Sequence, residues 1–312
     1  MGNYLKDKVA VVTGSGRGIG RGIAILMAQE GARVVVNDFG GGTDGSGGDK
    51  VPADEVVNEI KAKGGEAVAN YDSVASSEGG ENIIKTALDS FGQLDILVCN
   101  AGILRDRMVF NMSDEEWDDV LKVHLYGTFY CSRAACRVFR NQRSGRIINF
   151  SSSSGLGNLG QVNYSAAKEA IIGFTRTVAR DMGKYGITCN AIRPGAATRL
   201  TVTPELKAAM ERKAAQGIDG PSGTTPTGEF DISALDPDMV APFVVWLAGD
   251  ESANVNGYDF GVAAGDIQLY SQPQIIKTIF KKGRWTVDEL VEVFPKTLGA
   301  NLVNPSPTAT PK

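Results

Sequence analysis

The regular alternation of short apolar runs with helical patterns is the feature of this sequence that most constrains its fold. Over about the first 190 residues, six runs have the length and β-branched content of buried strands: Val9–Val12, Arg33–Val36, Glu66–Ala69, Asp95–Cys99, Arg146–Phe150 and Thr188–Ile192. Helical patterns lie at Ile19–Glu30, Ala53–Lys63, Glu81–Phe91, Ser113–Arg140 and Asn163–Tyr185. This order predicts an α/β chain with a parallel sheet covered on both faces, which right-handed crossovers make a doubly wound Rossmann fold.

Two segments interrupt this alternation. Phe39–Lys50 holds six glycines in twelve positions and is expected to be a loop. Residues 198–231 are rich in Gly, Pro and Thr around a short helical pattern, Pro204–Gln216, and follow the last of these strands. Ligands bind at that edge of such sheets, so this insertion is predicted to be a substrate lid. The expected organisation is one Rossmann domain over 1–266 and a C-terminal extension over 267–312, with a helix at Val287–Phe294 and a disordered tail at Asn304–Lys312.

Composition excludes several classes of protein. A net charge of −4 argues against a general binder of nucleic acid or of anionic membranes. Four cysteines without a C-x-x-C pair fit reduced thiols, and the single histidine, His124, argues against a histidine-rich metal site. No run approaches 18 consecutive apolar residues and no targeting segment is visible, so we expect a cytoplasmic protein without metal or membrane span.

A glycine cluster lies between the first expected strand and the first expected helix. Glycines in that place let the backbone turn tightly and approach a pyrophosphate at the start of the helix. The candidate cofactor residues there are Gly14, Ser15, Arg17, Gly18, Ile19 and Gly20. Asp38 ends the second strand about 20 residues later, where a carboxylate accepts the ribose hydroxyls and repels a 2′-phosphate. Asp38 could instead be an ordinary turn residue. If it binds the ribose, it favours NAD over NADP.

A phenol and an ammonium group stand four residues apart, at Tyr164 and Lys168, on one face of an expected helix. A fixed cation beside the phenol favours the phenolate, and two pKa units correspond to roughly 3 kcal/mol. By itself, such a pair usually lies on the solvent-exposed face of a helix. Ser151, at the carboxyl end of a strand, adds a hydroxyl that could hold a substrate oxygen beside Tyr164, although Ser152, Ser153 and Ser154 leave open which serine acts.

These motifs together resemble the short-chain dehydrogenase/reductase family over about Leu5 to Ala264. The resemblance implies hydride transfer to or from a nicotinamide, with Tyr164 as acid/base, Lys168 holding the ribose and lowering the phenol pKa, and Ser151 orienting the carbinol oxygen. It also implies that Asp72 meets the adenine and that Asn100 supports the cofactor site. The further residues that the family pattern assigns to the cofactor are Ser73, Ala101, Gly102, Pro194, Gly195 and Thr198.

One departure from the family pattern narrows the resemblance. His124 stands where the family has an asparagine that relays protons, so it either packs between helices or continues the relay. With its neighbours it resembles the (3R)-hydroxyacyl-CoA dehydrogenase domain of peroxisomal multifunctional enzyme type 2, also called 17β-hydroxysteroid dehydrogenase type 4, and bacterial stand-alone relatives.

This resemblance implies NAD-dependent oxidation of a (3R)-3-hydroxyacyl-CoA, with a steroid side-chain CoA ester as one candidate, and a homodimer or homotetramer. The alternatives are a 17β-hydroxysteroid or other secondary-alcohol dehydrogenase without a CoA handle, a 3-oxoacyl-carrier-protein reductase, and a nucleotide-sensing protein without chemistry. Arg105, Arg107 and Arg199 are candidate contacts for CoA phosphates, although charged loop residues are usually only solvated.

Overall fold

The computed structural model describes residues 2–196 and 235–305. The chain divides into two compact units, Met1–Tyr270 and Ser271–Lys312, and each is described by itself. The expected substrate lid lies outside the described residues, as do Thr198 and most of the expected C-terminal tail. No helix within the described ranges is long and apolar enough to cross a membrane.

The first unit is built on an eight-stranded sheet with the order β3-β2-β1-β4-β5-β6-β7-β8. Its strands are β1 (Val9–Thr13), β2 (Arg33–Asn37), β3 (Glu66–Asn70), β4 (Ile96–Cys99), β5 (Gly145–Phe150), β6 (Ile187–Gly195), β7 (Asp259–Ala263) and β8 (Asp266–Leu269). Every neighbouring pair from β3 to β7 is parallel. The strand order reverses between β1 and β4, and in such folds ligands bind beyond the carboxyl ends of the strands at that point.

Neither of the last two strands is among those expected, and β8 alone departs from the expected parallel sheet. β7 was not predicted because it is a short run interrupted by Gly261, and β8 pairs antiparallel with β7 through a tight turn. Ala264 and Gly265 in that turn both have positive φ. The compact unit therefore continues to Tyr270, and the boundary expected at residue 266 falls at the start of β8.

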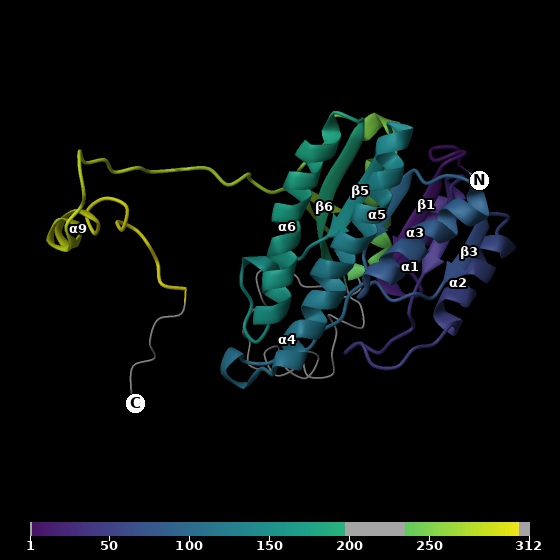
Figure 1. Cartoon of the computed structure of the whole chain (residues 1–312), viewed down its shortest axis with the longest axis horizontal. Helices are drawn as coiled ribbons and strands as arrows, with labels where there is room; N and C mark the ends of the chain where they lie inside the picture. Colours follow the sequence, from purple (N-terminus) through teal and green to yellow (C-terminus); the bar gives the residue numbers. More distant parts are fainter. Residues whose placement is uncertain (1, 197–234, 306–312) are drawn as a thin grey trace. The chain divides into compact units, whose positions relative to one another are not determined.

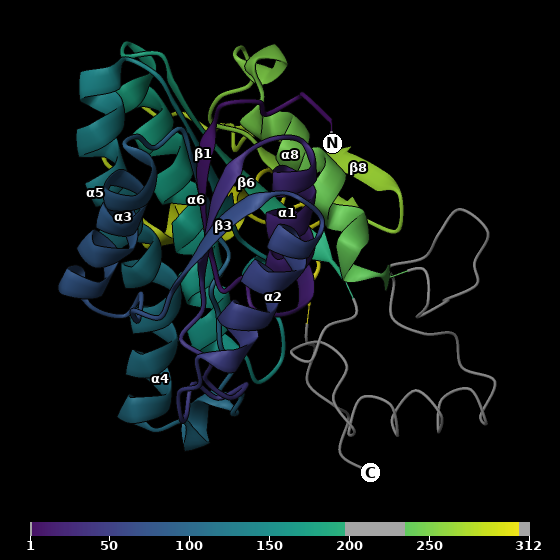
Figure 2. The ribbon, with the colours of Figure 1, turned by 90° about the vertical axis from the view of Figure 1, so that its right-hand side faces the viewer.

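Helices cover both faces of the sheet, as Figures 1 and 2 show. One face packs against α1 (Gly18–Gln29), α2 (Val51–Ala62) and α8 (Ala241–Ala248), and the other against α3 (Ser77–Phe91), α5 (Gly127–Gln142) and α6 (Val162–Gly183). β1 is buried along its whole length and contributes Ala10 and Val12 to one core, Val9 and Val11 to the other. The continuous apolar runs of the sequence are thus explained by burial on both faces, which confirms the doubly wound fold.

The helical pattern expected as one element at Ser113–Arg140 is three consecutive segments. α4 (Asp114–Leu121) starts with a capping box in which the Ser113 and Glu116 side chains each bond the other residue's backbone N–H. A π-helical turn, η2 (Lys122–Tyr126), then precedes α5. π turns insert one extra residue into a helix and are frequent at functional sites, and this one carries His124.

Over residues 271–305, the described part of the second unit, the structure has the short helix α9 (Val287–Val293), where the sequence predicts a helix ending at Phe294. It begins with a capping box formed by Thr286 and Glu289. Lys281 pairs with Glu289 and holds the segment before the helix against its first turn.

Candidate active site

The turn between β1 and α1 packs so closely that several of its positions have no room for a side chain. Gly14 and Gly18 have positive φ, +63° and +53°. A Cβ on Gly14 would lie 2.6 Å from the Cα of Ala101, and one on Gly20 would lie 2.3 Å from the Gly14 carbonyl oxygen. Only glycine fits such approaches. The turn therefore leaves the first N–H groups of α1 open to an anionic group, which a pyrophosphate would fit.

Asp38 follows β2 and is held by the backbone on both sides. Its Oδ2 accepts a hydrogen bond from Gly16 N at 2.8 Å, and its Oδ1 accepts one from Gly40 N at 2.7 Å. The residue is only 9% exposed. These bonds fix a carboxylate in the wall of a cavity, where it suits ribose hydroxyls better than a phosphate.

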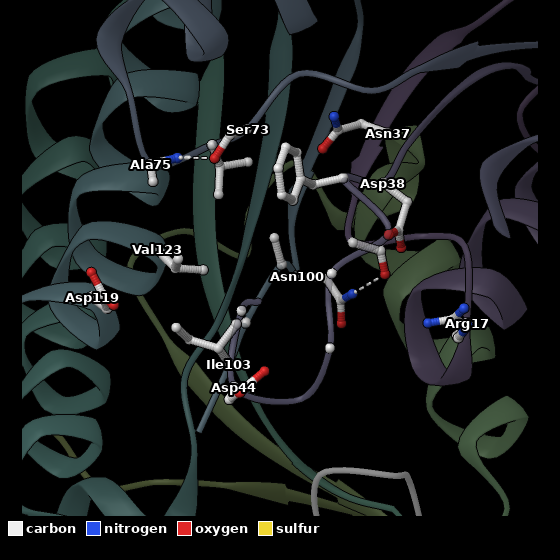
Figure 3. A pocket seen from close by; sticks show the side chains of 18 of the residues that line it. Arg17, Asn37, Asp38, Asp44, Ser73, Ala75, Asn100, Ile103, Asp119 and Val123 are labelled. Atoms are coloured by element: carbon white, nitrogen blue, oxygen red, sulfur yellow. Dashed lines mark hydrogen bonds between the residues drawn. The ribbon is translucent and has the colours of Figure 1, made fainter. Parts of the chain in front are cut away.

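A cavity of about 790 Å³ lies beside the ends of β1, β2 and β4 (Figure 3). Ten of the predicted cofactor residues line it: Gly14, Arg17, Gly18, Ile19, Asp38, Asp72, Ser73, Asn100, Ala101 and Gly102. Its other wall includes Phe39, Asp44, Ile103, Arg105 and Asp119. The size, the glycine turn and the fixed carboxylate together fit a dinucleotide cofactor, with its adenosine half in this cavity.

Polar side chains that line the cavity are held in place by hydrogen bonds to neighbouring residues. Asn100 Nδ2 donates to the carbonyl oxygen of Gly14 at 2.9 Å, which joins β4 to the glycine turn. Asn37 Nδ2 donates to Asn70 Oδ1 at 2.8 Å and to the Asp72 carbonyl oxygen at 2.9 Å. The sequence reasoning missed Asn37, although it immediately precedes Asp38 at the end of a strand. Figure 3 shows Asn37 and Asn100 on the same side of the cavity.

Other predicted cofactor residues stand apart from the described lining of this cavity. Ser15 is fully buried, and its hydroxyl donates to the Val12 carbonyl oxygen at 2.7 Å, so it ties the turn to β1. Gly20 packs against the turn itself. Pro194 and Gly195 are the last two residues of β6, where they pair with β7.

The predicted catalytic residues come together between β5 and α6. Lys168 Nζ lies 5.4 Å from the ring centre of Tyr164 and donates to the Phe150 carbonyl oxygen at 2.6 Å. Ser151 Oγ donates to the Lys168 carbonyl oxygen at 2.7 Å. Ser151 and Lys168 are both buried. The hydroxyl of Ser151 is therefore engaged with the helix in this structure, rather than directed at a substrate.

Burial dominates the protonation of this cluster. It raises the pKa of Tyr164 to about 12, although a hydrogen bond with the Ser152 side chain opposes the rise. Burial lowers the pKa of Lys168 from 10.5 to about 7. The chain alone does not show the expected lowering of the phenol pKa by Lys168: burial has the largest effect on the phenol, and Lys168 Nζ donates to the Phe150 carbonyl oxygen. The side chain that acts on the phenol pKa is that of Ser152, the neighbour of the serine that the family pattern assigns.

His124 is buried at the π turn, against the phenol. Its ring centre lies 5.0 Å from that of Tyr164 at an interplanar angle of 89°. Nε2 lies 2.7 Å from the Ile103 carbonyl oxygen and 3.1 Å from Ile103 N, while Nδ1 is buried and has no hydrogen-bond partner among the described residues. Burial first, and then the charge of Lys168, hold the pKa of His124 well below 6.5. A neutral imidazole thus packs edge-on against Tyr164.

Arg193 is a further residue of the site, to which the sequence analysis assigns no role. Its Nε donates to Asp259 on β7 at 2.9 Å, and its two terminal nitrogens donate to the Ser152 carbonyl oxygen at 2.9 Å and to Glu169 at 3.0 Å. Arg193 and Asp259 are both buried. One guanidinium thus joins β6 and β7 to α6 and to the serine turn. No local sequence pattern predicts this bridging role of Arg193, because its partners are far apart in the sequence.

Two of the arginines considered for CoA phosphates are already paired. Arg105 bonds Glu115 and Asp119, and Arg107 bonds Glu116. Arg199 lies outside the described residues. Within the part of the chain that the structure describes, His, Cys, Asp and Glu side chains form no cluster that could hold a metal ion.

Known proteins resemble this chain over both the cofactor cavity and the cluster of Ser151, Tyr164 and Lys168. The family model for short chain dehydrogenases matches residues 8–210, which include the cavity and the serine, tyrosine and lysine cluster. The chain is 45% identical over 276 residues to peroxisomal multifunctional enzyme type 2 of Mus musculus, covering 88% of this chain but only 34% of that enzyme. It is 38% identical over 300 residues to a hydroxyacyl-CoA dehydrogenase of Mycobacterium tuberculosis, covering 92% and 87%. A crystal structure of a short chain dehydrogenase from Mycobacterium avium is 43% identical, with a TM-score of 0.80 over 95% of this chain and 96% of that one.

Proposed function

The chain belongs to the short-chain dehydrogenase family, which uses a nicotinamide dinucleotide to act on CH–OH groups, and we propose that it oxidises a (3R)-3-hydroxyacyl-CoA to the 3-oxoacyl-CoA with NAD. Similarity to a hydroxyacyl-CoA dehydrogenase over 87% of that protein is the observation that carries the substrate class. Steroid side-chain CoA esters are one candidate within it. The preference for NAD is supported by Asp38, whose carboxylate is fixed in the cavity wall.

The chain's own residues divide the work of the reaction. A bound nicotinamide would accept the hydride from the carbinol carbon. Tyr164 takes the hydroxyl proton in oxidation and returns it in reduction. Because burial raises its pKa to about 12, Tyr164 is protonated at neutral pH in the chain alone, so oxidation should accelerate as pH rises. Lys168 Nζ lies 5.4 Å from the centre of the phenol ring and would hold the ribose.

Ser151 is proposed to orient the carbinol oxygen. To do so its hydroxyl must leave the Lys168 carbonyl oxygen, to which it donates in this structure. Ser152 is the competing residue, since its side chain acts to lower the pKa of the phenol against the effect of burial. Ser151→Ala and Ser152→Ala separate the two: the serine that orients the substrate should lose turnover by about 10²-fold or more, and the other should keep most of it.

His124 is proposed to extend a proton path from Lys168 outward, with simple packing against Tyr164 as the alternative. The buried, unpaired Nδ1 supports the relay, and the edge-on contact with Tyr164 supports packing. His124→Asn restores the residue of the family pattern. The variant should keep its turnover if the reaction requires a proton relay through this position. Its turnover should fall if the packing of the ring against Tyr164 is what the reaction requires.

The alternative function is a 17β-hydroxysteroid or other secondary-alcohol dehydrogenase that needs no CoA group. One observation favours it: Arg105 and Arg107 pair with carboxylates, so neither is placed to meet a CoA phosphate. The two functions share the same chemistry at Tyr164 and differ only in what holds the rest of the substrate.

Initial-rate reduction of NAD, with NADP in parallel, tests the proposal. The substrates are a short (3R)-hydroxyacyl-CoA, a steroid side-chain hydroxyacyl-CoA and a free 17β-hydroxysteroid. Turnover of the CoA esters with NAD supports the proposal, whereas turnover of the free steroid alone moves the function to the alternative. Tyr164→Phe is the control, because it should lose turnover and still bind NADH.

We also propose a homodimer or homotetramer in the cytoplasm, paired through α5 and α6. Ala166, Ala170 and Gly173 lie on one side of α6 and are exposed, while Ala167 is buried. A Cβ on Gly173 would meet nothing within 4 Å. Such small residues let a second helix approach closely. Sedimentation velocity measures the assembly, and Gly173→Glu should weaken it by placing a charge on that surface.

A further inference from the structure

The glycine-rich loop at residues 39–50 is an ordered wall of the cavity rather than a loose excursion. Its neck is closed by a hydrogen bond from Asp49 N to the Phe39 carbonyl oxygen at 3.2 Å. Gly40 has a φ of +75°, and a Cβ there would lie 1.8 Å from the Asp49 carbonyl oxygen. At the tip, Ser46 N and Oγ both donate to Asp44 Oδ1, at 3.0 and 2.7 Å.

The tip of this loop rests on the segment that follows β4. Leu104 N donates to the Thr43 carbonyl oxygen at 2.9 Å, and Arg105 Nε donates to the Asp44 carbonyl oxygen at 3.0 Å. Phe39, Asp44 and Ile103 line the same cavity as Asp38, and Figure 3 shows Asp44 and Ile103 beside each other on its wall. The loop and this segment therefore close one side of the cavity together.

Arg105 connects the loop to the body of the protein. Besides its bond to the loop tip, its guanidinium bonds Glu115 at 3.2 Å and Asp119 at 3.0 Å, both on α4. Its carbonyl oxygen accepts a hydrogen bond from Asn163 Nδ2 at 3.0 Å, one residue before the catalytic tyrosine. The two carboxylates hold the guanidinium in place, so its Nε–H points at the loop without further ordering.

We infer that Arg105 latches the loop at residues 39–50 over the adenosine half of a bound dinucleotide and thereby slows its dissociation. Glycine-rich backbone loses much conformational entropy on ordering, so contacts made by the tip decide whether the loop stays closed. Leu104 N and Arg105 Nε both donate to carbonyl oxygens of the tip from the segment after β4. Arg105 is a positioning residue, since it acts through the loop. The inference rests on the nucleotide site of the proposed function.

Release of NADH after displacement by excess NAD, followed by stopped-flow fluorescence, tests this inference. Arg105→Met should raise the dissociation rate constant roughly tenfold, as expected for loss of a hydrogen bond from a charged donor. Arg107→Met is the matched control, because Arg107 lies on the same segment and pairs with Glu116 on the same helix. It should change the rate less than twofold.

A second measurement needs no bound nucleotide. Amide hydrogen exchange of residues 39–50 in the cofactor-free protein should be faster in Arg105→Met than in wild type or Arg107→Met. Arg105→Lys keeps a cation for Glu115 and Asp119 but lacks the fork that also reaches the loop, so it should resemble Arg105→Met even if the latter folds poorly.

Unchanged release and unchanged loop exchange in Arg105→Lys would overturn the latch. Equal effects of the Arg105 and Arg107 variants would overturn it as well, because the effect would then belong to the whole segment. Failure of the wild type to bind NADH would instead overturn the nucleotide site itself. The readouts need no substrate, so the substrate class of the proposed function stands or falls separately.

Discussion

Lys168 is a buried lysine whose removal should stabilise the fold while abolishing catalysis. It is only 4% exposed, and burial lowers its pKa from 10.5 to about 7. At about 1.4 kcal/mol per pKa unit, this shift corresponds to a cost of about 5 kcal/mol for the charged form. Losing its bond to the Phe150 carbonyl oxygen costs about 1–3 kcal/mol. Lys168→Met should therefore raise the free energy of unfolding by about 3 kcal/mol near pH 6.

The pH dependence of this effect has a definite sign. The pKa of Lys168 is lower in the folded than in the unfolded chain, so between about pH 7 and 10.5 the unfolded chain binds more protons. The stability of the wild type should therefore rise with pH in that range, by up to about 1.4 kcal/mol per pH unit, and this dependence should level off below about pH 7. The advantage of Lys168→Met should shrink accordingly from pH 7 to pH 9.

Urea unfolding of the cofactor-free proteins at pH 6, 7, 8 and 9, at one protein concentration, measures this difference. The charge of Lys168 acts on the Cys99 thiol, but burial raises the pKa of that thiol to about 12, so it stays protonated in both folded proteins from pH 6 to 9. Lys184→Met, at an exposed lysine that ends α6, is the control and should follow the wild type. A Lys168→Met protein that is less stable than wild type at every pH, by a constant amount, would refute the reasoning.

Two further predictions concern the cofactor cavity and the phenol. Asp38→Asn keeps the shape of the side chain and removes its charge, so the ratio of NADPH to NADH dissociation constants, measured by fluorescence titration, should fall at least tenfold. In Gly102→Ala, the new Cβ would lie 2.4 Å from Cε1 of His124. The ring is confined by Ile103 and Tyr164, so the variant should lose about 1–3 kcal/mol of stability in urea unfolding and much of its turnover.

Each of these has a result that contradicts it. An unchanged cofactor ratio in Asp38→Asn would show that the carboxylate does not face the ribose. A Gly102→Ala protein as stable and as active as the wild type would show that His124 can move away without disturbing Tyr164, and that its edge-on contact with the phenol carries no function.

Much of the fold could be predicted because it depends on local patterns. The six expected strands are all present, and all but the edge strand β3 are mostly buried, as their short apolar runs predict. β7, β8 and α8 were harder to predict, because they are short and are stabilised mainly by packing against residues far away in the sequence. The π turn within the expected helix Ser113–Arg140 was also missed, because one extra residue in a turn leaves little trace in apolar periodicity.

The candidate site divides along the same line. The sequence by itself determined the glycine turn, Asp38 and the Tyr164–Lys168 pair, because each depends on spacing within one strand, turn or helix. Only the tertiary structure decided which partners the buried groups have. It turned the Ser151 hydroxyl onto α6, set His124 against the phenol and joined Arg193 to Asp259. The physical reason is that burial and pairing depend on residues far apart in the chain, and these set the pKa values and orientations on which the chemistry depends.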